Sequence, residues 1–190
     1  VDYSKKLGKG TFKALLAGNF QNVRIDKVTY PAQIASNPTA RKAFYSDREE
    51  AFLKASAPKQ KFSFNLDYTM KHLGFGAHFT YFGKVQLKGF GLDGTGVDPQ
   101  APADLYPYDG VPENFDFKGK LTTDLYASYK INKSVSVFIG ADNIFNVHPD
   151  LGVNPLAKGY FGDNESGGPW DSVQMGFNGR RLFAKLAFNF

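Results

Sequence analysis

The fold is decided by the stretch KFSFNLDYTMK, which covers residues 61–71. Apolar side chains occupy every second position of this stretch, and polar side chains fill most of the positions between them. Successive side chains of a β-strand point to opposite faces, whereas a helix would scatter these residues around its axis. The stretch therefore predicts a strand with one apolar and one polar face. The apolar set is Phe62, Phe64, Leu66, Tyr68 and Met70, and the polar set is Ser63, Asn65, Asp67 and Thr69.

The same alternation returns in five further stretches, and short turns near residues 8–10, 71–74 and 132–134 join several of them into hairpins. Residues 1–7 carry the end of one more strand, so the sequence predicts six strands and an N-terminal stub. The predicted strands cover residues 11–24, 61–71, 75–85, 121–131, 135–146 and 182–190.

The composition supports β structure and limits the possible chemistry. Aromatic residues make up 16% of the 190 residues and are joined by 20 glycines, whereas helix-rich chains favour Ala, Leu, Glu and Lys. The absence of cysteine excludes disulfides and thiolate chemistry. No apolar run approaches the roughly 18 residues of a membrane-spanning helix. The net charge is +5, but its basic residues are spread along the chain, so we expect no nucleic-acid binding.

Short turns alternate with long segments near residues 26–58, 89–117 and 147–177, and all 10 prolines lie in these long segments. Outer-membrane barrels have short periplasmic turns, long extracellular loops, an apolar outer face and a polar interior. The sequence therefore predicts an all-β fold, a transmembrane antiparallel β-barrel. A lipocalin-like barrel or a soluble β-sandwich would also use two-faced strands, and these alternatives stay open.

Aromatic residues are also expected to gather at two heights along the strands, as in the aromatic girdles of membrane barrels. The short-turn set is Tyr68, Phe75, Tyr129, Phe188 and Phe190, and the set toward the long loops is Phe62, Phe79 and Tyr81.

Three motifs resemble TonB-dependent outer-membrane receptors. The sequence ADNIFNVHP at 141–149 resembles a characteristic strand end of that family, with His148 where tyrosine is common, and GFNGRR at 176–181 resembles the approach to its last strand. The segment SDREEAF at 46–52 is similar to receptors of Bacteroidetes-type bacteria. The final strand resembles the signal that outer-membrane proteins present to the barrel-assembly machinery. That signal comprises Leu182, Ala184, Leu186, Phe188 and Phe190.

This resemblance implies that residues 1–190 are the C-terminal part of a 22-stranded barrel, because the chain has about a third of the family's usual length. We expect the remaining barrel strands and the N-terminal plug to lie in another chain or an upstream segment, since an open sheet would leave unpaired edges in lipid. The resemblance also implies contact with the TonB complex through that missing region, and with outer-membrane lipid and lipopolysaccharide in the bacterial outer membrane.

No enzyme, cofactor or metal site is predicted. The sequence GFGLDG at 89–94 matches GxGxxG, but the prolines that follow prevent a helix from opening there. His72, His78 and His148 are far apart and lack the spacing of metal ligands. Asp67 and Asp124 are interpreted as hydrated carboxylates of the barrel interior rather than as an acid–base pair.

The long loops are the predicted binding region. Segments 89–117 and 147–177 are rich in Asp and Glu, so the predicted outer rim is acidic. A short amphipathic helix is expected over residues 41–54, with Phe44, Phe52 and Leu53 facing inward. Loop aromatics are candidate substrate contacts, although packing within the loop is an equal alternative. They are Tyr106, Tyr108, Tyr160, Phe161 and Trp170.

The function implied by the resemblance is active uptake of a scarce nutrient, most often a ferric siderophore in that family. The acidic loops leave the cargo open, because many ferric chelates are anionic. Two other functions stay open. One is a small eight-stranded outer-membrane barrel acting as an adhesin or a minor channel, and the other is a soluble β-sandwich binding module.

Overall fold

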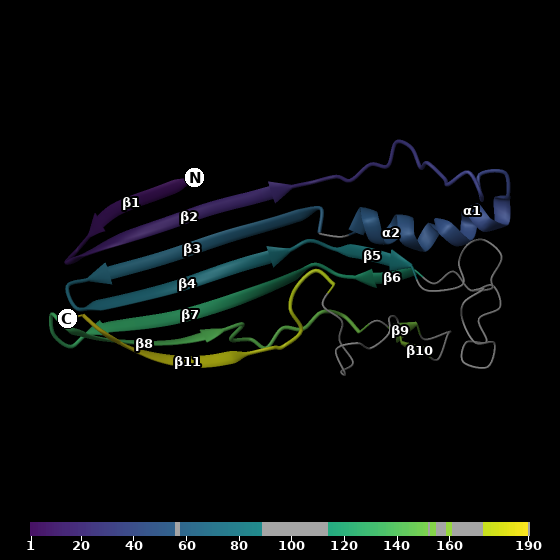
Figure 1. Cartoon of the computed structure of the whole chain (residues 1–190). Coiled ribbons are helices and arrows are strands. Elements are labelled where there is room, and N and C mark those ends of the chain that lie inside the picture. Colours follow the sequence, from purple (N-terminus) through teal and green to yellow (C-terminus); the bar gives the residue numbers. More distant parts are fainter. Residues whose placement is uncertain (56–57, 89–113, 152, 155–158, 161–172, 190) are drawn as a thin grey trace.

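The computed structural model describes residues 1–55, 58–88, 114–151, 153–154, 159–160 and 173–189. Its main feature is a seven-stranded sheet with the order β1-β2-β3-β4-β7-β8-β11, in which every neighbouring pair is antiparallel (Figure 1). The strands are β1 (Asp2–Leu7), β2 (Gly10–Phe20), β3 (Gln60–Met70), β4 (Leu73–Phe82), β7 (Lys120–Lys130), β8 (Val135–Asp142) and β11 (Arg181–Phe188).

The alternation of apolar and polar residues predicted the positions of these strands well. The predicted and observed strands differ only at their ends. The strand expected to reach residue 146 stops at Asp142, because Asn143 and Asn146 adopt left-handed backbone angles with φ of 47° and 55°. Asparagine tolerates this conformation because its side chain can hydrogen-bond to the local backbone. The strand expected to reach residue 24 ends at Phe20.

Short turns and long connections lie at opposite ends of the sheet. The β1–β2, β3–β4 and β7–β8 turns lie together at one end, and the helices lie at the other (Figure 1). The long-connection end also carries two small two-stranded sheets. One joins β5 (Val85–Lys88) to β6 (Asn114–Phe117), and the other joins β9 (Val153–Asn154) to β10 (Gly159–Tyr160).

The expected single helix over residues 41–54 is wrong, because two helices occupy this region. They are α1 (Pro38–Phe44) and α2 (Asp47–Ala55). The chain is extended at Tyr45, which closes α1, and Ser46 directly precedes α2. The Ser46 N–H donates to the Glu49 carboxylate over 3.1 Å, and the Ser46 hydroxyl also bonds to that carboxylate. This local bonding at the helix start resembles a capping box and separates the two helices.

The inward orientation expected of three apolar side chains on these helices stays a prediction, because the described sheet is open and exposure does not show which way they point. Phe44 is 54% exposed, Leu53 is 52% exposed and Phe52 is 36% exposed. The helix α2 contacts the rest of the fold at its end, where Ala55 packs against a small core formed by Val85, Leu87 and Phe117.

The seven-stranded sheet itself is a single layer (Figure 1). Its first strand, β1, pairs only with β2, and its last strand, β11, pairs only with β8, so the described sheet is open. Apart from the small core at the long-connection end, the buried apolar residues of the described chain are Ala141 and Met175. None of the helices in the described ranges is both long enough and apolar enough to cross a membrane.

Candidate functional site: the two faces of the sheet

One face of the sheet is mostly apolar from β2 to β11. At its centre, one residue from each of six neighbouring strands forms a row across the sheet. Each residue of the row is the cross-strand partner of the one on the next strand, and alanine and leucine alternate along it. The leucines stand out from this row, with exposed fractions of 38% for Leu125 and 74% for Leu182. The members of the row, from β2 to β11, are Ala14, Leu66, Ala77, Leu125, Ala141 and Leu182.

Aromatic side chains flank this aliphatic row on both sides, at the heights expected from the sequence. Toward the short turns, Tyr68 pairs with Phe75, which is 49% exposed. Toward the long connections, Phe64 stacks on Phe79 with ring centroids 6.2 Å apart, and Phe62 stacks on Tyr81 in the next row. The apolar face is therefore an aliphatic band between two aromatic bands, which is the pattern of a lipid-facing barrel surface.

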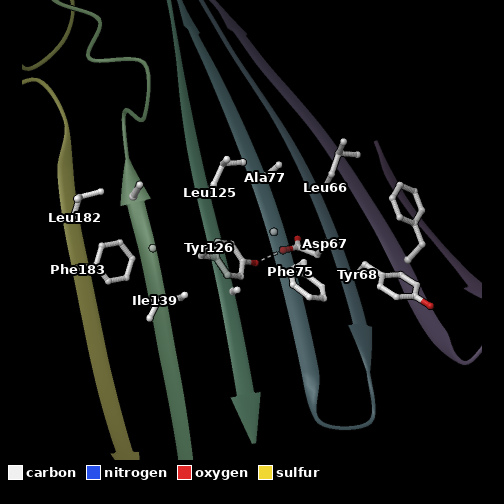
Figure 2. A pocket seen from close by; sticks show the side chains of 15 residues that line it. Leu66, Asp67, Tyr68, Phe75, Ala77, Leu125, Tyr126, Ile139, Leu182 and Phe183 are labelled. Carbon is white, nitrogen blue, oxygen red and sulfur yellow. Dashed lines mark hydrogen bonds between the residues drawn. The ribbon is translucent and has the colours of Figure 1, made fainter.

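A hollow of about 710 Å³ lies on the apolar face (Figure 2). Its floor contains the short side chains of Ala77 and Ala141, while Phe75, Ile139 and Leu182 form part of its wall. Most of its lining is apolar. Asp67 and Tyr126 also belong to the lining, where they hydrogen-bond to each other.

The opposite face carries the polar residues, and three of them form a cluster. The Tyr126 hydroxyl donates to the Asp67 carboxylate across β4, as the dashed line in Figure 2 shows. His78 lies beside both groups, with its Nε2 atom 3.6 Å from Asp67 Oδ1 and its ring 5.1 Å from the ring of Tyr126. Each member of this cluster comes from a different strand, β3, β4 or β7.

A glycine makes this cluster possible. Gly76 of β4 lies between Asp67 and Tyr126 in the register, and the Tyr126 ring occupies the space that a Cβ atom at residue 76 would need. The same arrangement recurs on this face where the Phe183 ring covers Gly140. Aromatic rings lying over glycines fill the gaps that the missing side chains leave in a sheet.

The cluster was not predicted from the sequence. Asp67 and Asp124 were expected to be hydrated carboxylates, and the structure gives each a protein partner: Asp67 accepts from Tyr126, and Asp124 accepts from the Asn143 N–H over 2.7 Å. The pairing of His78 with Asp124 and of Gly76 with Tyr126 depends on the β4–β7 register. No short turn fixes that register, because a long connection joins these strands, so the sequence alone offered no signal for it.

The asparagine-rich turn after β8 ties three parts of the chain together. Asn143 bonds to Val147 through both its side-chain atoms, and the Ile144 N–H donates to Thr123 O on β7 over 2.8 Å. Asn146 Oδ1 accepts from the Arg180 N–H over 2.9 Å, just before β11 begins. The motif that carried the family resemblance is therefore a structural clamp between β7, β8 and the start of β11.

At the long-connection end, the described acidic residues of the predicted rim have local partners. Asp150 accepts from the Lys118 N–H over 2.6 Å and from Lys120 Nζ over 2.5 Å. Burial alone would raise the pKa of the Asp150 carboxyl, but these hydrogen bonds and the lysine charges outweigh it and lower the pKa below its ordinary value. Asp116 accepts from the Gln86 side-chain amide over 2.7 Å.

Most predicted substrate contacts fall outside the described residues. This applies to the side chains of Tyr106, Tyr108, Tyr160, Phe161 and Trp170, and to the glycine motif at 89–94, so their roles stay predictions. The backbone of Tyr160 forms part of β10. Of the predicted assembly signal, Leu182, Ala184, Leu186 and Phe188 lie on β11 on the apolar face, and Phe190 lies outside the described residues.

The three histidines have separate surroundings. His72 Nδ1 lies 3.1 Å from Lys130 O, His148 Nδ1 lies 3.0 Å from Phe177 O, and His78 belongs to the polar cluster. In the described part of the chain, no group of three or more His, Cys, Asp or Glu side chains is placed to hold a metal ion. The sheet therefore has one apolar face and one face that carries hydrogen-bonding groups.

Comparisons with known proteins support this interpretation of the fold. No protein-family model matches the chain, and no curated protein matches it either. Among solved structures, it is similar to a chain of the FpvAI–pyocin S2 complex, with a TM-score of 0.52 and 14% identity over 98% of this chain and 18% of that one. It is also similar to a mutant of the ferric enterobactin receptor PfeA from Pseudomonas aeruginosa, with a TM-score of 0.50 and 16% identity over 100% of this chain and 21% of that one.

At these identities the similarity shows the fold alone, and the chain spans about a fifth of the length of these structures. The antiparallel order, the two-faced strands and the structural neighbours agree with one another. The fold of the chain is that of a run of antiparallel strands from an outer-membrane β-barrel.

Proposed function

We propose that this chain forms part of the barrel of a TonB-dependent receptor, which takes up a scarce nutrient across the bacterial outer membrane. The observation that carries the proposal is the apolar face, an alanine–leucine band between aromatic bands with nothing packed on it in the described structure. Its strands β2, β3, β4 and β7 are 10 or 11 residues long, and a tilted strand needs about 9–11 residues to cross a bilayer.

The proposal includes orientation. The short turns would face the periplasm, the long connections would face the medium, and the Asp67–Tyr126–His78 cluster would line the aqueous interior. The open edges of β1 and β11 would pair with further strands of the same barrel, since unpaired backbone groups are very unfavourable in lipid.

The absence of cysteine allows a sharp test of this orientation. Leu66→Cys and Asn65→Cys place single thiols at adjacent positions of β3, on opposite faces. Each variant is labelled with a fluorophore in the membrane-embedded protein, and quenching is measured. We expect a lipid-phase nitroxide to quench the label at residue 66 and iodide in water to quench the label at residue 65. Equal quenching of both labels by iodide, or a protein that stays in solution without detergent, would refute the membrane proposal.

For the cargo, we propose a ferric siderophore or a similar chelate. The similarity to a ferric enterobactin receptor supports this choice, although it extends to the fold only. The test compares iron-starved cells that carry or lack the gene for this chain, and measures uptake of radioactive iron from a panel of siderophores. Uptake of one chelate should depend on the gene and should stop when a protonophore removes the energy source.

A matched control is the uptake of cobalamin by the same cells, which should not change. If iron uptake is the same with and without the gene for every chelate tried, the siderophore proposal is wrong. In that case peptides, glycans and cobalamin are the next cargo classes to test with the same pair of strains.

A further inference from the structure

A second hollow lies at the long-connection end of β3, β4 and β7 and has a volume of about 560 Å³. Unlike the larger hollow, it is lined by cationic and amide side chains. Three lysines line it, Lys59, Lys84 and Lys118, and all three are exposed. Gln60, Gln86 and Tyr81 supply further hydrogen-bonding groups to its lining. These residues come from separate segments of the chain, so the lysines are gathered by the fold rather than by sequence.

Among the residues that the structure describes, the lysines of this basic hollow outnumber the acidic residues of its lining. Within the described ranges, the ammonium groups of Lys59, Lys84 and Lys118 have no salt-bridge partner. Asp116 is the acidic residue of the lining, and its carboxylate already accepts a hydrogen bond from Gln86 over 2.7 Å. Among the lining residues, three lysines against one carboxylate leave an excess of two positive charges. Asp150, which accepts from the Lys118 N–H just outside the lining, pairs with Lys120. The excess therefore favours an anionic ligand.

The backbone that carries these lysines is held in place. The Lys118 N–H donates to Asp150 over 2.6 Å, and Lys118 O accepts from the Gln174 side chain over 2.6 Å. Lys59 O accepts from the Gln21 N–H over 2.9 Å. The backbone at two of the lysines is therefore fixed by hydrogen bonds before any ligand binds, which lowers the backbone entropy lost on binding.

The hollow borders the apolar face at Tyr81, Gln60 and Gly119, which form part of its lining. Tyr81 pairs with Phe62 in the aromatic band, and Gln60 lies two residues beyond Phe62 on the same face of β3. The Tyr81 hydroxyl lies against Gly119, which is also part of the lining. Moving along the apolar face toward the long connections, one therefore meets the aliphatic row, then the aromatic band, and then the basic hollow.

We propose that this basic hollow binds the phosphate group of a membrane lipid, in the leaflet at the long-connection end. The inference rests on the proposed function, since it requires the apolar face to be in lipid. Aromatic bands lie at the level of lipid headgroups, and lysines beside them extend toward the headgroup phosphates. Ammonium–phosphate hydrogen bonds are charge-assisted and strong. A soluble anionic cargo would instead be expected on the polar face, which lines the aqueous interior.

The test uses the protein extracted from membranes in a neutral detergent and measures lipid binding by native mass spectrometry. The probes are dioleoylphosphatidic acid, which carries a phosphomonoester, and dioleoylphosphatidylcholine, which is zwitterionic; a third arm adds inorganic phosphate as a competitor. The test variant is Lys59→Gln/Lys84→Gln/Lys118→Gln. The matched control, Lys5→Gln/Lys6→Gln/Lys9→Gln, removes the same charge from exposed residues at the short-turn end.

We expect the unmodified protein and the control variant to bind phosphatidic acid in preference to phosphatidylcholine. The test variant should bind phosphatidic acid about tenfold more weakly or worse, because it loses several charge-assisted hydrogen bonds. Equal binding of phosphatidic acid by the test and control variants would overturn the proposal. Displacement of the lipid by inorganic phosphate at matching concentrations would also overturn it, by showing a site for soluble anions.

Failure of the lipid site is distinguishable from failure of the proposed function. The test variant should still assemble in the membrane and give the same quenching pattern at residues 65 and 66 as the unmodified protein. If membrane assembly is normal and only the lipid preference is missing, the basic hollow alone is wrongly assigned. If the chain does not enter membranes at all, the proposed function fails together with this inference.

Discussion

Glycines and aromatic rings on the polar face depend on one another. The Tyr126 ring crosses β4 above Gly76 and reaches Asp67, while the Phe183 ring covers Gly140. A glycine inside a strand normally weakens the strand, because it adds backbone freedom and leaves no side chain to pack. Here the ring above each glycine restores the packing, so both partners of each pair are needed.

The first prediction concerns Gly76→Ala. The added methyl group would occupy the space of the Tyr126 ring and would separate its hydroxyl from Asp67. We expect a loss of about 1–3 kcal/mol in the free energy of unfolding, the range for overpacking at a filled site. The measurement is thermal unfolding of the protein in detergent. Gly176→Ala is the control, because nothing lies within 4 Å of the position that its Cβ would take; equal effects of the two changes would refute the explanation.

The second prediction concerns Asp150 and pH. The pKa of its carboxyl is lower in the folded chain than in the unfolded chain, so its hydrogen bonds stabilise the fold fully above the unfolded pKa of about 4. This stabilisation should disappear as the pH falls through the lower folded pKa. Because the Asp150 and Lys120 side chains are partly exposed, we expect a contribution of about 1 kcal/mol or less.

The measurement for Asp150 is the unfolding free energy of the unmodified protein and of Asp150→Asn between neutral and acidic pH. The variant should be less stable near neutral pH, and the difference should shrink as the medium is acidified. A difference that stays constant over the whole range would show that the carboxylate charge contributes nothing.

At the scale of the element, β11 has two different faces and two different edges. Leu182, Leu186 and Phe188 lie on the apolar face, where they are 74%, 53% and 55% exposed. One edge of the strand pairs with β8, and the other has no partner in the described sheet. A strand with a free edge and an exposed apolar face is well suited to recognition by an assembly factor through strand pairing.

The third prediction therefore concerns the last strand. Phe188→Ser removes an exposed aromatic side chain without disturbing a buried contact, so we expect several-fold less protein in the outer membrane, with little change in the stability of the protein that does assemble. The amount is measured by immunoblotting of membrane fractions. Ala187→Ser alters the neighbouring residue, whose side chain points to the other face, and should leave the amount unchanged. Equal amounts of both variants would contradict an assembly role for Phe188.

Elements were predictable where the chain alternates and less so where it does not. The residues of β3 sort cleanly by face, and the predicted strand matches the observed one within a residue. The break between α1 and α2 was missed, although Ser46 followed by Glu49 is a known helix-start signal, because apolar residues continue at helical spacing across it. The small sheet of β5 and β6 was missed because it pairs residues from opposite ends of a long connection.

At the scale of the whole molecule, the described sheet lacks a second layer. The polar cluster and the basic hollow each combine residues from strands that the sequence separates widely. Local alternation defines each strand and its faces, but only the register across the β4–β7 connection brings Tyr126 to Asp67. The faces could therefore be predicted from the sequence, whereas the clusters on them could not.

The fourth prediction tests the environment of the two faces. Leu66→Arg places a charge in the central row of the apolar face, and Asn65→Arg places the same charge one residue away on the polar face. A charged side chain on the lipid face near the bilayer midplane destabilises a barrel by about 2–4 kcal/mol. We expect Leu66→Arg to assemble poorly and Asn65→Arg to assemble normally, as judged by the heat-dependent shift of folded barrels on gels. Improved solubility of Leu66→Arg without detergent would refute the lipid assignment.

The two open edges of the sheet have a practical consequence. β1 and β11 each present an unsatisfied border of backbone donors and acceptors, and such borders pair readily with any complementary strand. Copies produced in isolation would be expected to join side by side into insoluble ribbons. Supplying the complementary strands as a second polypeptide should divert these copies into discrete assemblies, which makes the chain a suitable fragment for split-protein reconstitution.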